Sequence, residues 1–244
     1  MLLNRLTRLK GYGRYACLGA AVLEVLGRRY KMHNLQKGRS DYLEQSLQNP
    51  ANLCRPEQAV PLLARDYIAP TIAQQSVLCP TFRPQVIFMD SFSELTDQMF
   101  RHKTEHWSFC CNYSDLLHDG PLSDTFESIG LLDLSDLQGR YVRLSQRARQ
   151  LWGNIPIVYL HFPDTLETRE KFIQRAAEIR RVAEACAQAI PGFYSFSVPS
   201  AIVQPPRVVE AGMEDFPYHY SEETYQAFAD LITQQPHLRR LFAV

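Results

Sequence analysis

The sequence predicts an α/β fold: a three-layer α/β/α sandwich around a five-stranded, mainly parallel sheet. Short apolar runs bounded by turn residues alternate with segments in which apolar residues recur every three or four positions. These are the patterns of buried strands and of amphipathic helices. A strand, a helix and a second strand in this order favour parallel neighbours with helices on both faces of the sheet. The chain has 244 residues, 45% of them hydrophobic, so we expect a single domain over residues 1–244.

Five apolar runs are the expected strands. The first is RYACLG at 14–19, which leads directly into AAVLEVLG, the start of an amphipathic helix. The strongest is IPIVYLHF at 155–162, which is apolar on both faces, as in a strand buried on both sides. The other three are YKMHNL at 30–35, QVIFM at 85–89 and FYSFSV at 193–198.

Two helices are well marked in the second half of the chain. The first lies between the last two strands, where Asp164 or Thr165 can cap its start and Pro191-Gly192 end it. The second follows Ser221, a typical N-cap residue, with two glutamates in its first turn and an apolar stripe at helical spacing behind them.

Two long connecting segments are less regular. Residues 36–84 contain six prolines, so we expect short helices joined by loops there. Residues 101–150 are rich in charged and aromatic residues. We expect them to form a helical or loop-like insertion over the upper edge of the sheet.

Charge and composition exclude several classes of protein. Lys+Arg and Asp+Glu both number 26, so no net charge attracts nucleic acid or an anionic membrane. The apolar stretch near the N-terminus is interrupted by Glu24 and is too short to cross a bilayer, so we expect no membrane span. The six cysteines include no CxxC pair and no zinc-ligand spacing. We expect reduced thiols in a soluble, cytoplasmic protein that needs no metal and no cofactor.

His219 is the strongest candidate for a catalytic residue. Open parallel sheets bind ligands beyond the carboxyl ends of their strands, and His219 stands on a short loop before the C-terminal helix. Asp215 lies four positions earlier and could orient the imidazole, so the two residues suit a general base and its acidic partner. The alternative is that His219 is a surface residue in a turn.

The ending DFPYHYSEETYQAF (215–228) resembles that of the SGNH/GDSL hydrolase superfamily, in which Asp and His before the last helix serve a Ser nucleophile placed after the first strand. The interval from Asp215 to His219 is one residue longer than is usual there. The segments VIFMDSFSELTDQMF, HFPDTLETREKFIQR and PYHYSEETYQAFADLI resemble SGNH-like proteins of bacterial polysaccharide biosynthesis. This resemblance implies an SGNH/flavodoxin-like fold. It also implies ester hydrolysis or acyl transfer on a carbohydrate, with a carbohydrate or an acylated small molecule as the substrate.

The chain departs from this family at the nucleophile. Where the family has Gly-Asp-Ser or Gly-Ser after its first strand, this chain has Gly19-Ala20-Ala21. Alanine cannot attack a carbonyl, so Ala20 predicts very low activity. In an active form, His219 would deprotonate a Ser, Asp215 would orient His219, and the Gly19–Ala21 backbone would help hold the oxyanion.

Three interpretations of this departure are open. Ala20 replaces a Ser, by evolution or by design; Ser91 supplies the nucleophile instead; or the domain binds a ligand without turning it over. Cys17 is expected to pack inward, just short of the end of the first strand. Outside ester chemistry, the alternatives are a non-catalytic carbohydrate-binding or accessory protein of polysaccharide biosynthesis, and a glycosyl- or other group-transfer enzyme on a similar sheet.

Polar residues that follow two other strands are candidate substrate contacts. Asp90, Ser91 and Glu94 come after the third strand, where the family usually contributes polar groups to the oxyanion hole or the substrate. Alternatively, Asp90 or Ser91 caps a helix that extends to Met99. His161 ends the fourth strand and is either a second imidazole facing the substrate or a buried, hydrogen-bonded residue.

Overall fold

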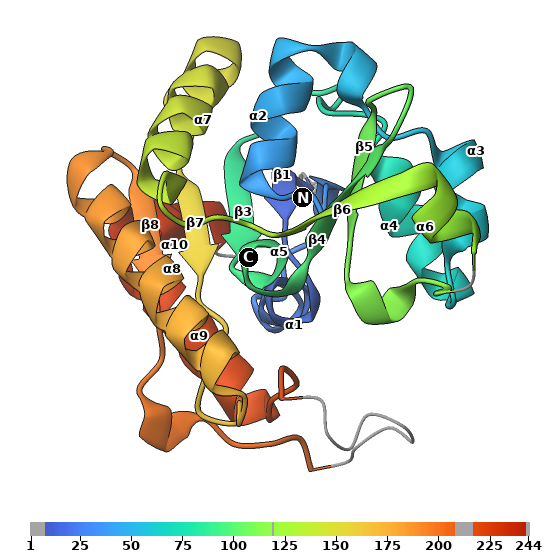
Figure 1. Ribbon diagram of the computed structural model, residues 1–244. Coiled ribbons are helices and arrows are strands. Elements are labelled where there is room, and N and C mark those ends of the chain that lie inside the picture. Colours follow the sequence, from blue (N-terminus) through green and yellow to red (C-terminus); the bar gives the residue numbers. More distant parts are fainter. Residues whose placement is uncertain (1–7, 119, 208–216, 243–244) are drawn as a thin grey trace.

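The computed structural model describes residues 8–118, 120–207 and 217–242 (Figure 1). Five strands form one sheet in the order β2-β1-β3-β7-β8, and every neighbouring pair is parallel. The strands are β1 (Leu9–Arg14), β2 (Tyr30–Asn34), β3 (Val86–Asp90), β7 (Ile157–Leu160) and β8 (Phe193–Phe196). The predicted α/β class with a five-stranded parallel sheet is therefore confirmed.

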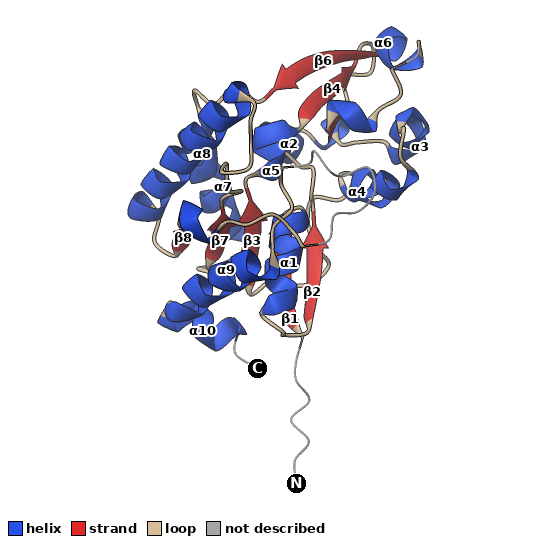
Figure 2. Ribbon diagram, turned by 90° about the horizontal axis from the view of Figure 1, so that it is seen from below, coloured by secondary structure: helices blue, strands red, loops and turns tan. Residues whose placement is uncertain are grey.

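Helices cover both faces of this sheet (Figure 2). One layer is formed by α1 (Cys17–Val25), α9 (Glu222–Gln234) and α10 (Pro236–Phe242), and the other by α2 (Ser40–Gln48), α7 (Leu137–Trp152) and α8 (Glu170–Ala189). Phe88 of β3 contacts Phe242, whereas Tyr159 of β7 contacts Tyr141. Because Tyr159 pairs with Met89, the neighbour of Phe88, the two contacts lie on opposite faces. None of the helices in the described ranges is long and apolar enough to cross a membrane.

The proline-rich segment after β2 forms short helices and turns, as predicted. After α2 come α3 (Pro56–Ala59), α4 (Ala69–Gln74) and 3-10 turns at Pro50–Asn52, Val60–Leu62 and Asp66–Ile68. Further short elements are α5 (Phe92–Thr96), α6 (Pro121–Thr125) and 3-10 turns at Tyr113–Asp115 and Ser200–Ile202.

The prediction of helices and loops for residues 101–150 misses three strands. A second, antiparallel sheet in the order β5-β4-β6 lies there, built from β4 (Gln98–His102), β5 (Ser108–Cys111) and β6 (Phe126–Leu131). Trp107, Phe109 and Phe126 are buried together in it, so its aromatic residues form a small core and not an exposed loop. The helical part, α7, belongs to a layer of the main sheet. Met99 lies in β4, not in the helix expected after Asp90.

The first strand also differs from its prediction. It ends at Arg14, and the apolar run 14–19 forms the turn into α1 and the first residues of that helix. The polar sequence LKGYGR can nevertheless be a central strand for two reasons. A Cβ on Gly11 would lie 2.4 Å from Met32 Sδ, so glycine permits close packing. The charge of Arg14 is buried against Glu94.

Candidate active site

The loop that carries His219 is fixed to the segment between β7 and α8 through both neighbours of the histidine. The Tyr218 hydroxyl donates a hydrogen bond to Glu167 at 2.5 Å, and the Tyr220 hydroxyl donates to the Pro163 carbonyl oxygen at 2.8 Å. Both tyrosines are buried, whereas His219 is half-buried. The loop backbone is therefore held in place while the imidazole keeps some access to solvent, as a general base requires.

Helix α9 begins just behind this loop, as predicted. Ser221 is its N-cap residue, and the hydroxyl oxygen accepts a hydrogen bond from the Thr224 N–H at 3.4 Å. The predicted cap of α8 is wrong, because α8 begins at Glu170 and Asp164 accepts a hydrogen bond from Arg180 instead.

Glu167 is the buried anchor of the loop. Arg169 donates to both of its carboxylate oxygens, at 2.8 and 2.7 Å. Burial opposes the ionisation of Glu167, but the hydrogen bonds from Arg169 and Tyr218 outweigh it and lower the pKa to about 2. Glu167 is therefore ionised at neutral pH and holds Tyr218, a role that the sequence alone does not predict.

Cys17 lies next to the His219 loop. It is the first residue of α1, directly beyond the carboxyl end of β1. Its thiol donates a hydrogen bond to the Tyr218 carbonyl oxygen at 3.5 Å, and that carbonyl carbon is bonded to the backbone nitrogen of His219. Cys17 is partly buried and packs against the hydrophobic core, as predicted, although it lies at the start of α1 and not in a strand. Asp215, the predicted partner of His219, lies outside the described residues.

The surroundings of Cys17 keep its sulfur protonated at neutral pH. Burial raises the pKa of the thiol to about 12, and the nearby Asp90 carboxyl adds to the rise. The backbone N–H groups of Leu18 and Cys17 itself act in the opposite direction, as does Lys37. A reaction at this sulfur therefore needs a base that removes the proton.

Asp90 fastens the start of α1 to the end of β3. One carboxylate oxygen accepts hydrogen bonds from Ala16 N at 2.7 Å and Gly19 N at 3.2 Å, and the other accepts from Phe92 N at 3.1 Å. Burial raises the pKa of Asp90 to about 7 against the effect of these three bonds. The side chain is only 1% exposed, so Asp90 positions the helix that carries Cys17 and is closed to a substrate in this structure.

The Gly19–Ala21 segment does not follow a strand. It lies inside α1, where Gly19 N donates to Asp90 and Ala20 N donates to the Ala16 carbonyl oxygen. The methyl group of Ala20 is exposed on the helix. The N–H groups of Gly19 and Ala20 are therefore already hydrogen-bonded within the fold. The backbone N–H groups that act on the Cys17 sulfur are those of Cys17 and Leu18.

Ser91 and Glu94 are both buried and hold neighbouring elements together. Ser91 Oγ accepts a hydrogen bond from Phe162 N at 3.0 Å, which ties β3 to the segment after β7. Glu94 is paired with Arg14 and accepts a hydrogen bond from Ser40 N at 3.1 Å. They are 3% and 0% exposed, so neither reaches the surface beside Cys17.

His161 is buried and hydrogen-bonded, the second of the two roles considered for it. Its Nε2 atom is 2.7 Å from Ser195 Oγ on β8, and the residue is 3% exposed. Burial, with a smaller contribution from Arg180, lowers its pKa to about 3. The imidazole is therefore neutral at neutral pH and links two strands.

The His161→Gln variant should be less sensitive to acid than the wild type. The depressed pKa of His161 means that the unfolded chain binds a proton between pH 6.5 and about 3 that the folded protein does not. As the pH falls through this window, the wild-type free energy of unfolding should lose about 1.4 kcal/mol per pH unit relative to the variant. Asp90, with its raised pKa, acts in the opposite sense but is present in both proteins. Urea unfolding at several pH values measures the difference, and a constant difference would contradict the assignment.

A hollow adjoins the His219 loop on the side of the small sheet. It holds about 1020 Å³ of space, part of it open to solvent. Pro217 and Tyr218 form one wall, and the start of α8 with Lys171 forms another. The wall on the small-sheet side carries polar side chains, namely Gln98, Asn112 and Ser114.

Comparisons of the chain with protein-family models, with curated proteins and with solved structures find no match. Within the described ranges, no group of three or more His, Cys, Asp or Glu side chains is placed to hold a metal ion.

Proposed function

We propose that this protein is an acyl-transferring enzyme in which Cys17 is the nucleophile and His219 is the general base. The observation that carries this proposal is the contact between the Cys17 thiol and the carbonyl of Tyr218, the residue before His219. In this proposal the thiol takes the role that Ser has in the SGNH-like hydrolases that the sequence resembles, a role that the sequence alone assigns to the position of Ala20. Ala20 is three residues further along the helix.

The chemistry follows from the state of the thiol. Because its pKa is raised to about 12, the proton has to pass to His219 as the sulfur attacks the carbonyl carbon of an acyl ester. The N–H groups of Cys17 and Leu18, at the positive end of α1, would stabilise the oxyanion. The imidazolium then protonates the leaving alcohol, and the acyl group stays on Cys17 as a thioester. Water or a second hydroxyl, deprotonated by His219, completes hydrolysis or transfer.

We propose an acylated carbohydrate, or another acylated small molecule, as the substrate. The hollow beside Tyr218 supports this assignment, since the side chains of Gln98, Asn112 and Ser114 line it and amides and hydroxyls match sugar hydroxyl groups. In this proposal Asp215 orients the His219 imidazole, as the acid of a triad does.

Acetylation of Cys17 by p-nitrophenyl acetate tests the proposal. Peptide mass mapping should place the acetyl group on Cys17, and the His219→Ala variant should form this adduct at least about a hundredfold more slowly. His237→Ala, which removes an exposed histidine of α10, is the matched control and should react like the wild type. Equal acetylation of Cys17 in all three proteins would exclude His219 as the base.

The raised pKa of the Cys17 thiol also favours a second candidate, a carbohydrate-binding protein without turnover, because a protonated thiol is a poor nucleophile. If the protein only binds carbohydrate, no acetyl group should be found on Cys17. Oligosaccharide binding should then persist in the Cys17→Ala and His219→Ala variants.

A further inference from the structure

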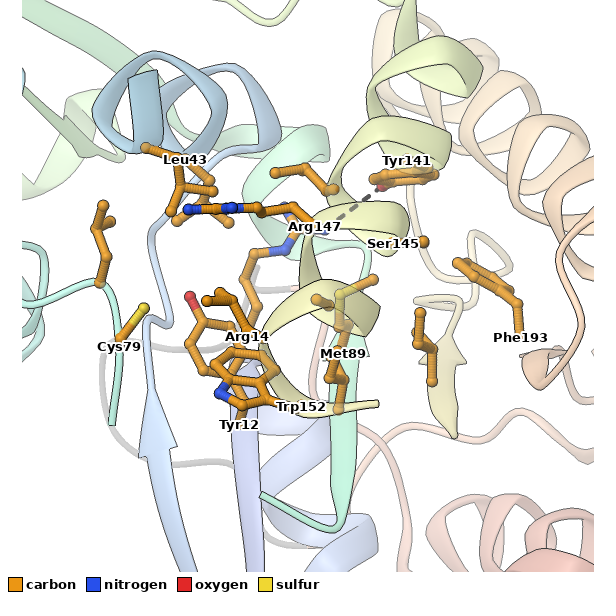
Figure 3. Close-up of a pocket in the computed structure, with 17 residues that line it drawn as sticks. Tyr12, Arg14, Leu43, Cys79, Met89, Tyr141, Ser145, Arg147, Trp152 and Phe193 are labelled. Carbon is orange, nitrogen blue, oxygen red and sulfur yellow. Dashed lines mark hydrogen bonds between the residues drawn. The ribbon is translucent and has the colours of Figure 1, made fainter. Parts of the chain in front are cut away.

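A separate pocket lies under α2 and α7, on the face of the sheet opposite α1 (Figure 3). The pocket is partly open to solvent. Its walls are mostly apolar and include Leu43, Met89, Leu144, Ala148, Trp152 and Phe193. Cys17 and the described residues of the His219 loop do not line it.

Three residues with polar groups line one side of this pocket, namely Tyr12, Cys79 and Arg147. Figure 3 shows the Tyr12 hydroxyl pointing toward the sulfur of Cys79, while Arg147 extends from α7 toward Leu43 of α2. The Arg147 charge opposes the rise that burial causes in the pKa of Cys79, so the guanidinium and the thiol are within electrostatic reach of each other.

Arg147 differs from other arginines of α7 in its partners. Arg140 and Arg143 are both close to the Asp136 carboxylate. Arg147 donates only a 3.3 Å hydrogen bond to the neutral Gln150, and no carboxylate of the described residues lies within ion-pair distance of it. An exposed cation beside an apolar pocket is complementary to a ligand that has an anionic head and an apolar body.

The mouth of the pocket exposes apolar side chains. Leu151, a lining residue, is 42% exposed, and Val77, next to the lining residue Leu78, is 49% exposed. Covering such surface is favourable, and apolar surface beside a pocket is typical of a binding site.

We propose that this pocket binds a small apolar carboxylate, such as a medium-chain fatty acid. Its alkyl chain lies against Leu144, Ala148 and Trp152, and its carboxylate accepts hydrogen bonds from Arg147. The positive charge of Arg147 disfavours an alkylammonium ion. An alcohol of the same length makes the apolar contacts but lacks the charged hydrogen bond to Arg147. The site is independent of the chemistry at Cys17.

Octanoate and octan-1-ol, added separately below their aggregation limits, test the proposal by titration calorimetry. Octanoate should bind one to one, and Arg147→Gln should weaken it about tenfold, since a charge-assisted hydrogen bond is lost. Octan-1-ol should bind the wild type and Arg147→Gln equally. The matched control is Arg149→Gln, which removes an arginine of the same helix that does not line the pocket. Absence of octanoate binding, or equal binding by the wild type and Arg147→Gln, would overturn the proposal.

Alkylation of Cys79 provides a second measurement. Of the six cysteines, Cys79 alone is exposed, and it lines the pocket. Octanoate should slow its reaction with iodoacetamide, as followed by peptide mapping, and should leave the reaction of Cys17 unchanged. Ala148→Phe fills the pocket and should remove this protection while the protein stays folded by circular dichroism. Protection that persists in folded Ala148→Phe would place octanoate elsewhere and refute the site.

Discussion

Replacing Cys17 with alanine should abolish ester turnover, whereas Ala20→Ser should leave the wild-type rate unchanged. Loss of the nucleophile of a triad typically lowers the rate by a factor of about a thousand or more. The new hydroxyl of Ala20→Ser would be on the exposed side of α1, whereas the Cys17 thiol touches the loop of His219. Hydrolysis of p-nitrophenyl acetate by the two variants and the wild type measures both effects.

The Cys17→Ser variant separates a nucleophile from a structural residue. A hydroxyl is close to isosteric with the thiol but a weaker nucleophile, so turnover should fall between that of the wild type and that of Cys17→Ala. All three proteins should unfold at similar urea concentrations, because the side chain is only half-buried. Turnover that rises on Ala20→Ser would instead favour the alignment that puts the nucleophile at Ala20.

The parts of the fold that could be predicted are those with a local signal. The strands β7 and β8 lie in short runs rich in apolar and aromatic residues. Helix α9 has its cap and its apolar stripe within one short segment. β1 has no such signal. Its glycines fit because β2 packs closely, and its buried arginine is paired with a residue 80 positions away. Partners so distant in the chain leave no local pattern.

The candidate site shows the same limit. The position of His219 before a capped helix could be read from neighbouring residues. The position of Cys17 could not be predicted in this way, because it depends on where β1 ends. The predicted strand ends five residues after β1 does, and this error places Ala20 at the edge of the sheet. A strand assigned to 9–14 would have made Cys17 the first residue of the helix beyond it.

Polar residues after β3 illustrate a third difficulty. The sequence allows Asp90, Ser91 and Glu94 to be substrate contacts and Asp90 or Ser91 to be a helix cap. All three are buried and bonded to other parts of the chain. A polar residue at the carboxyl edge of a sheet either faces a ligand or satisfies buried groups of the fold. The sequence alone does not separate these roles, whereas the stability of substituted proteins does.

Glu94→Gln should therefore lower the free energy of unfolding by about 3–5 kcal/mol, the usual result of leaving one member of a buried ion pair without its partner. The side chains of Arg14 and Glu94 are 2% and 0% exposed. Glutamine keeps a hydrogen-bond acceptor but removes the negative charge, and arginine cannot escape by losing its proton. Urea unfolding of the variant and the wild type at neutral pH measures the loss.

Two further variants test whether the unpaired buried charge causes the loss of stability in Glu94→Gln. Glu178→Gln removes a carboxylate that binds Arg181 on the exposed side of α8 and should leave the unfolding midpoint nearly unchanged, since exposed pairs contribute little. Combining Arg14→Met with Glu94→Leu removes both charges, so the double variant should recover much of the stability that Glu94→Gln loses. If Glu94→Gln costs as little as Glu178→Gln, Glu94 is not the buried partner of Arg14. A substrate contact that is open to solvent would then be the better assignment.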